Sequence, residues 1–104
     1  MNPSNRTHCV PSSILCALIY GIAHGKPVRI AITELGPGVD HAQAQVQDEN
    51  GHWLWLSEFW NGTCMEARII GGPNHPAAGE PHTYYTVREF LNQQANALNL
   101  EDVL

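Results

Sequence analysis

Charged side chains are scarce in this sequence, and basic ones are the scarcest. Only 14% of the 104 residues are charged, and the formal net charge is −5 at pH 7. The five basic residues are scattered along the chain, at Arg6, Lys26, Arg29, Arg68 and Arg88. Nucleic acids and anionic membranes are bound by clustered cations that replace counterions at the phosphates. The sequence therefore argues against both partners and favours a protein or peptide.

Long apolar runs and paired cysteines are also missing. The longest apolar stretch, residues 14–23, is too short to span a membrane and is interrupted by Gly21. Residues 1–10 lack the apolar segment of a secretory signal. Three cysteines are an odd number, which does not fit a disulfide framework. These absences predict a reduced, cytoplasmic protein, although delivery into a host or a phage origin would leave the same pattern.

What the sequence does contain is enough apolar material for one folded unit. Hydrophobic residues make up 43% of the chain. A chain of this length can bury a core without help from metals or disulfides, and it is too short for two domains. We therefore expect a single domain over residues 1–104, with its oligomeric state left open.

A helix is expected near each end of the domain. Apolar residues recur at helical spacing at Ile14, Leu15, Leu18, Ile19 and Ile22. Because Pro11 fits best in a first turn, this helix is expected at residues 9–24, after a polar lead-in at residues 1–8. Residues 86–89 (Thr-Val-Arg-Glu) form a capping box, which predicts a second helix ending near Leu98. Residues 99–104 are expected to fray.

The segment between the two helices has the pattern of a sheet. Apolar and polar residues alternate in three stretches, at residues 28–33, 41–47 and 52–56, and Asn50-Gly51 predicts a tight hairpin turn. Two further strands are expected, at residues 64–70 and 84–85. Glycine and proline predict loops at residues 34–40 and 71–82.

The order of these elements predicts an α+β fold. An N-terminal helix should pack on an antiparallel sheet of about four to five strands, with a C-terminal helix completing the domain.

Cys9 is the first candidate for chemistry. At the start of a helix, unpaired backbone N–H groups and the positive end of the helix dipole favour a thiolate, which is the nucleophilic form of cysteine. The same N–H groups can stabilise an oxyanion when the thiolate attacks a carbonyl. The alternative is a small buried cysteine without a chemical role, which is the interpretation preferred for Cys16 and Cys64.

His41 is the second candidate, on the polar face at the start of a strand. A helix start and a sheet packed against it can bring Cys9 and His41 together as a thiolate–imidazolium pair. The alternative is a histidine that faces solvent at a strand end.

A third group is expected to orient the imidazole ring. Counting outward from the Asn50-Gly51 turn places residues 57–61 beside His41. Glu58 is the first choice and Asn61 the second, with an ordinary exposed acid as the alternative for Glu58. Asp40 is weaker, because neighbours in a strand point to opposite faces.

These residues resemble those of the transglutaminase-like and papain-like cysteine peptidase superfamily. The matching features run in order along the chain: Cys9 opening a helix, Gly-Lys-Pro-Val-Arg at residues 25–29, His41-Ala42 opening a strand, and Gly-His-Trp at residues 51–53. The resemblance covers roughly residues 9–61. It implies that Cys9 is the nucleophile, that His41 is the base, and that Glu58 occupies the position usually held by aspartate.

The sequence thus predicts a cysteine-dependent hydrolase or acyl transferase acting on an amide or ester carbonyl. Peptidase, amidase and transglutaminase-like activities remain open. The alternative is a non-catalytic binding or inhibitory module that keeps the fold. A third interpretation, a structural assembly subunit, would show a large exposed apolar patch.

Two further expectations concern cofactors and aromatic residues. No cofactor or metal is expected, because clustered cysteine and histidine ligands are missing and His8, Cys9 and His41 are the only sensible set. Trp55 and Trp60 are candidates to line a substrate cleft, with packing in the core or sheet as the alternative.

Overall fold

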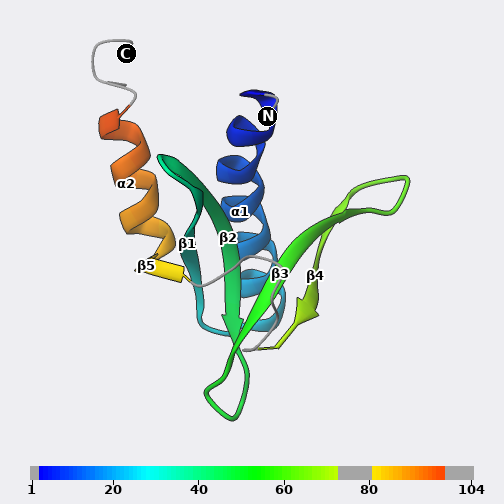
Figure 1. Ribbon diagram of the computed structural model, residues 1–104. Helices are drawn as coiled ribbons and strands as arrows, with labels where there is room; N and C mark the ends of the chain where they lie inside the picture. Colours follow the sequence, from blue (N-terminus) through cyan, green and yellow to red (C-terminus); the bar gives the residue numbers. More distant parts are fainter. Residues whose placement is uncertain (1–2, 73–80, 98–104) are drawn as a thin grey trace.

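A computed structural model describes residues 3–72 and 81–97, in which one helix precedes and one helix follows a five-stranded antiparallel sheet in the chain (Figure 1). In chain order the elements are α1 (Pro3–His24), β1 (Val28–Gly36), β2 (Val39–Gln47), β3 (Trp53–Trp60), β4 (Met65–Gly71), β5 (Pro81–Tyr85) and α2 (Val87–Ala97). The predicted α+β fold is confirmed. Among the described residues, no helix is both long enough and apolar enough to cross a membrane.

The sheet has the strand order β4-β3-β2-β1-β5, and every neighbouring pair is antiparallel. The predicted turn between β2 and β3 is present: Gly51 has φ 84°, and its N–H donates to the carbonyl of Asp48 at 3.1 Å. The capping box of α2 is also present. Glu89 N–H donates to Thr86 Oγ1 at 3.1 Å, and Thr86 N–H donates to Glu89 Oε1 at 2.9 Å.

One predicted loop is replaced by strand, and two other predicted segments lie partly or wholly outside the described residues. The expected loop at residues 34–40 is a tight hairpin, in which only Pro37 and Gly38 separate β1 from β2 and Gly38 has φ 73°. In the expected loop at residues 71–82, the first residue belongs to β4 and the last two belong to β5. Residues 73–80 lie outside the described part of the chain. The expected tail at residues 99–104 also lies outside it.

The prediction that α1 begins near Cys9, after a polar lead-in, is wrong, because the helix already begins at Pro3. Pro11 lies inside the helix, where it has no N–H to donate to the carbonyl of residue 7. Nearby, the hydroxyl of Ser13 donates to the carbonyl of Val10 at 2.9 Å. A proline within a helix is costly but not forbidden, and for this reason its position could not fix where α1 starts.

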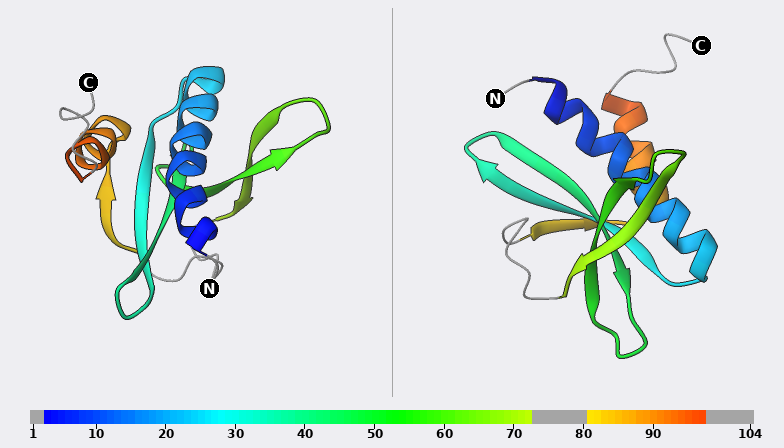
Figure 2. Two further views of the ribbon diagram at one scale, coloured as in Figure 1. Left: turned by 90° about the horizontal axis from the view of Figure 1, so that it is seen from above. Right: turned by 90° about the vertical axis from the view of Figure 1, so that its right-hand side faces the viewer.

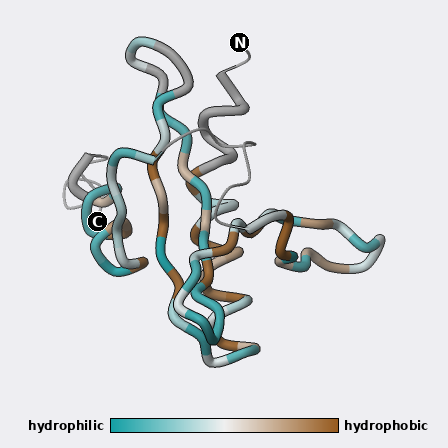
Figure 3. Tube along the Cα trace, turned by 60° about the horizontal axis from the view of Figure 1, so that its bottom comes forward, coloured by the Kyte–Doolittle hydropathy of each residue, from teal (hydrophilic) through white to brown (hydrophobic). Residues whose placement is uncertain are grey.

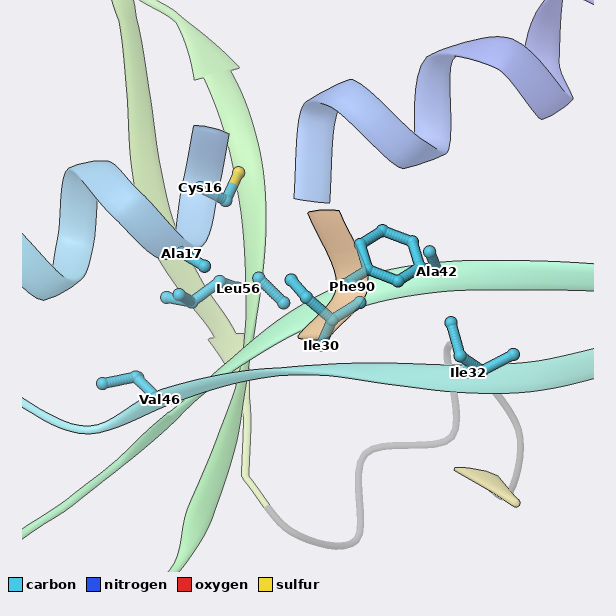
Figure 4. Close-up of a cluster of buried hydrophobic side chains, with 9 residues drawn as sticks. Cys16, Ala17, Ile30, Ile32, Ala42, Val46, Leu56 and Phe90 are labelled. Atoms are coloured by element: carbon cyan, nitrogen blue, oxygen red, sulfur yellow. The ribbon is translucent and has the colours of Figure 1, made fainter. Parts of the chain in front are cut away.

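One face of the sheet packs on α1 and on Phe90 of α2 (Figures 2 and 4). The buried cluster joins both helices to three strands through Cys16, Ala17, Ile30, Ile32, Ala42, Ala44, Val46, Leu56 and Phe90. Hydrophobic and hydrophilic residues alternate along the strands in Figure 3, as a sheet with one covered face requires. The small side chains of Ala42 and Ala44 leave room for α1 to lie close to β2.

The other face of the sheet carries a cluster of polar and aromatic side chains. The guanidinium carbon of Arg29 lies 4.0 Å from the ring centroid of Trp53 and 3.8 Å from that of Tyr84. Its Nε donates to Gln45 Oε1 at 2.7 Å. Trp55 is buried on this face against Ala31. Arg29 on β1 is therefore linked to β3 and β5 by cation–π contacts and to β2 by a hydrogen bond.

Replacing Thr33 with valine should raise the free energy of unfolding by about 1 kcal/mol. Thr33 is buried, and its Oγ1 has no hydrogen-bond partner among the described residues. Valine keeps the shape of the side chain and removes the unsatisfied hydroxyl. Urea denaturation measures the change, with Thr33→Ser as the control that keeps the hydroxyl. A lower stability for Thr33→Val would show that the hydroxyl makes a stabilising bond.

Candidate functional site

A pocket of about 320 Å³, lined by both polar and apolar side chains, lies where α1 meets β2 and β3. We call it the α1–β3 pocket. It is lined by three residues of α1, four of β2 and three of β3: Ser12, Ser13, Cys16, His41, Ala42, Gln43, Ala44, Leu56, Ser57 and Glu58. His41 and Glu58, which the sequence predicted for one site, therefore line the same pocket.

The pocket exists because β2 and β3 pair over only part of their length. Their pairing runs from Gln47–Trp53 to Gln45–Trp55. The register of β3 on β4 shifts between Trp55 and Leu56, and such irregularities bend a strand. Beyond this point β3 and β4 run away from β2 as a separate hairpin (Figures 1 and 2). The split between the strands leaves the space that forms the pocket.

The split also explains how His41 reaches a pocket shared with α1. Ala42 and Ala44 pack in the core beside α1, so alternation places His41 and Gln43 on the opposite face of β2. In a continuous sheet, β2 would separate these two side chains from the helix. Because β3 has left β2 here, residues of both faces line one opening.

Gln43 bridges the split. Its amide Nε2 donates to the carbonyl of Leu56 on β3 at 2.9 Å. Its Oε1 lies 3.3 Å from Nε2 of His41. The side chain of Gln43 thus contacts both the imidazole ring and the neighbouring strand.

Glu58 interacts with α1 in this structure. Its Oε2 accepts a hydrogen bond from the hydroxyl of Ser12 at 2.6 Å, and the hydroxyl of Ser57 lies 3.5 Å from the same oxygen. The group found beside the ring of His41 is Gln43. Sequence reasoning passed over both Ser12 and Gln43. The signal for Gln43 was its place two residues after His41, on the same face of a strand.

Cys16 forms an apolar part of the pocket wall. Its side chain is only 1% exposed. Burial first, and then the negative charge of Glu58, raise the pKa of the Cys16 thiol to about 11, against a smaller lowering by the hydroxyl of Ser12. A thiol with such a pKa is protonated at neutral pH and is a poor nucleophile. This agrees with the prediction that Cys16 is structural.

The reason first given for activating Cys9 is wrong, although its role as nucleophile stays a prediction. The unpaired N–H groups of a helix belong to its first four residues, and α1 begins at Pro3. Position 9 is therefore more than one turn inside the helix. Positions 9, 13 and 16 share one face of a helix, and Ser13 and Cys16 line the pocket. The backbone thus places Cys9 on the face of α1 that carries the pocket, one turn before Ser12 and Ser13.

Three other candidates lie outside the pocket lining. Asn61 shapes the turn between β3 and β4, where its Oδ1 accepts from the N–H groups of Thr63 and Cys64 at 2.9 and 3.0 Å. Trp55 is buried on the other face of the sheet. Trp60, at the end of β3, is 65% exposed.

Two further features concern acidic and metal-binding groups. The carboxylate of Asp40 lies 3.4 Å from Nε2 of His82. Among the side chains that the structure describes, no three histidine, cysteine, aspartate or glutamate residues are grouped to hold a metal ion.

Comparison with protein-family models, with curated proteins and with solved structures found no match to this chain.

Proposed function

We propose that this chain is a cysteine-dependent hydrolase or acyl transferase acting on an amide or ester carbonyl. Cys9 is the proposed nucleophile and His41 the proposed acid–base group. The observation that carries the proposal is the α1–β3 pocket, because it joins His41 to the face of α1 on which position 9 lies. The resemblance to transglutaminase-like and papain-like peptidases supports the same pair.

The proposed reaction has two steps. His41 accepts the thiol proton of Cys9, and the thiolate attacks the carbonyl carbon of the substrate. The leaving amine or alcohol departs with the proton from His41, and a thioester remains on Cys9. Water or an amine then attacks the thioester and frees the thiol, which gives hydrolysis or acyl transfer. Since position 9 lies inside α1, activation of the thiol depends on His41 and not on the end of the helix.

The other polar groups of the pocket have supporting roles in this proposal. The hydroxyls of Ser12 and Ser57 and the carboxylate of Glu58 lie beside the opening. Hydroxyls can donate to a substrate carbonyl, and a carboxylate favours amide N–H groups or a cationic side chain. A pocket of this volume is at the small end of the range for ligand sites, which suits an acyl group or a single side chain.

The chain should form an acetyl thioester at Cys9 when it is mixed with p-nitrophenyl acetate. Release of p-nitrophenolate measures the reaction, and mass spectrometry after acid quenching locates the acetyl group. Cys9→Ser is the test variant, and Cys64→Ser is the matched control because Cys64 is an exposed thiol in the turn before β4. Acetylation confined to Cys64, or release that is unchanged in Cys9→Ser, would refute the proposal.

A second candidate function, a non-catalytic module that binds a partner or assembles through an apolar surface, is favoured by the outward face of α1. Four apolar residues at helical spacing are exposed there: Leu15, Leu18, Ile19 and Ile22. Ile22 is 82% exposed, and residues 10–24 contain no aspartate, glutamate, lysine or arginine. Exposed apolar patches mark interaction sites.

The acetylation experiment separates the two functions. A binding module needs no reactive thiol at position 9, so its Cys9 should react no faster than an ordinary exposed cysteine. Substitution of Ile22 by glutamate should leave acetylation unchanged if the site is catalytic, because Ile22 is absent from the pocket lining.

A further inference from the structure

We propose that Gln43 is a positioning residue that holds the ring of His41 with its hydrogen on Nε2. Nδ1 is then the nitrogen that exchanges the catalytic proton. The ring orientation follows from the structure alone, whereas its meaning for catalysis rests on the proposed function. Two hydrogen bonds carry this proposal, and they run from β3 through Gln43 to the ring.

The first bond fixes the orientation of the Gln43 amide. A backbone carbonyl can only accept, so the atom that faces the oxygen of Leu56 at 2.9 Å must be the NH₂ nitrogen of Gln43. The two amide positions are thereby assigned from their surroundings. The amide oxygen, Oε1, is left facing His41.

The second bond fixes the tautomer of His41. Oε1 of Gln43 can only accept, and it lies 3.3 Å from Nε2 of the ring. Nε2 must therefore carry a hydrogen, and in the neutral imidazole the lone pair is then on Nδ1. At 3.3 Å the contact is slightly longer than the usual N–H···O range of about 2.7–3.2 Å, so it selects a ring orientation more than it adds stability.

The fold provides this arrangement at the point where β3 separates from β2. Residues two apart on a strand share a face, which puts Gln43 next to His41. The backbone pairing of β2 with β3 stops at Gln45–Trp55. The carbonyl of Leu56 therefore accepts a hydrogen bond from a β2 side chain, that of Gln43, and not from the β2 backbone. Glu58, the group expected from the sequence to orient the ring, accepts from Ser12 instead.

The proposed tautomer is suited to both steps of the reaction. Nδ1 accepts the thiol proton and later gives it to the leaving group, while Nε2 keeps its hydrogen throughout. The bond to Gln43 therefore does not have to break when the ring becomes an imidazolium. Gln43 holds the base without exchanging a proton itself.

The tautomer can be measured in protein carrying ¹⁵N-labelled histidine. The His41 signals are assigned by their loss in His41→Gln, and the protonated ring nitrogen is identified by its chemical shift and its attached proton. We expect hydrogen on Nε2 in wild type, with an Nε2–H proton that exchanges slowly with water. In Gln43→Leu this slow exchange should be lost and the Nδ1–H form should gain population.

Two variants serve as controls. Gln43→Glu retains an acceptor for the ring and should keep the Nε2–H form. Gln47→Leu removes a glutamine from the same strand whose amide contacts Gly51, and it should leave the His41 signals unchanged. A wild-type ring with its hydrogen on Nδ1, or His41 signals that do not respond to Gln43→Leu, would overturn the inference.

A kinetic measurement separates this inference from the proposed function. Gln43→Leu should slow acetylation of Cys9 by roughly 10-fold to 100-fold through misorientation of the base. If the ring behaves as expected but Cys9 does not acetylate, the proposed function fails and the positioning role stands. If Cys9 is acetylated while the His41 signals do not respond to Gln43→Leu, only the positioning role fails.

Discussion

The Leu56→Ala variant should lose about 2–5 kcal/mol of unfolding free energy. Leu56 is 1% exposed and packs in the cluster that joins α1 to the sheet (Figure 4). Truncation removes its buried apolar surface and leaves a cavity beneath the helix. Because the total stability of a small domain is about 5–15 kcal/mol, the loss should be evident as a large shift of the urea midpoint.

Ile69 is the matched control for Leu56. The two residues are paired across β3 and β4, but Ile69 is 45% exposed. Ile69→Ala should therefore cost clearly less than Leu56→Ala. Equal losses would mean that the core does not lie between α1 and β3. The Leu56 carbonyl belongs to the backbone, so Leu56→Ala should preserve the bond to Gln43 in its folded molecules.

Local patterns predicted the fold well wherever one short stretch decides the conformation. Alternation placed Ala42, Ala44 and Val46 on one face, and all three are buried there. The turn predicted from Asn50-Gly51 and the helix start predicted from the capping box at residues 86–89 were also correct. Each depends only on residues that are close together in the sequence.

The differences arise where distant contacts outweigh a local signal. Pro11 indicated a helix start, yet α1 continues through Pro11, and the helix packs on the sheet. Glycine and proline at residues 34–40 indicated a loop, yet cross-strand pairing of β1 with β2 extends to Gly36 and Val39. Neither the packing of α1 on the sheet nor the pairing of β1 with β2 can be predicted from residues that are neighbours in the sequence.

The candidate site shows the same division. Hairpin counting placed His41 and Glu58 near each other, and both line the α1–β3 pocket. The partners of these residues were not predicted, because they depend on where β3 leaves β2. That point is set by the irregularity at Trp55 and Leu56, for which the sequence has no obvious signal.

The second large effect is expected from His41→Gln. Position 9 is inside α1, so a thiolate there requires the imidazolium of His41 and cannot rely on the helix end. Glutamine is polar and of similar size, but it cannot carry the proton. Acetylation of Cys9 by p-nitrophenyl acetate should slow by roughly 100-fold or more. A loss smaller than about 3-fold, in a variant that remains folded, would remove His41 from the mechanism.

The chain contains the internal references that such an experiment needs. Cys64 is free and exposed, so it reports the reactivity of an ordinary thiol in the same sample. Cys16 is buried with a pKa raised to about 11, so it should stay unmodified until the protein unfolds. Protection of Cys16 then shows that the variants retain their core.

The most direct test of the proposed Cys9–His41 pair is the rate of iodoacetamide alkylation at each cysteine at about pH 6, where ordinary thiols are almost entirely protonated. Peptide mapping by mass spectrometry gives the three rates in one sample. We expect Cys9 to be alkylated well before Cys64 in the wild type, and we expect this difference to disappear in His41→Gln. Alkylation of Cys9 no faster than that of Cys64 in the wild type would contradict the proposed pair.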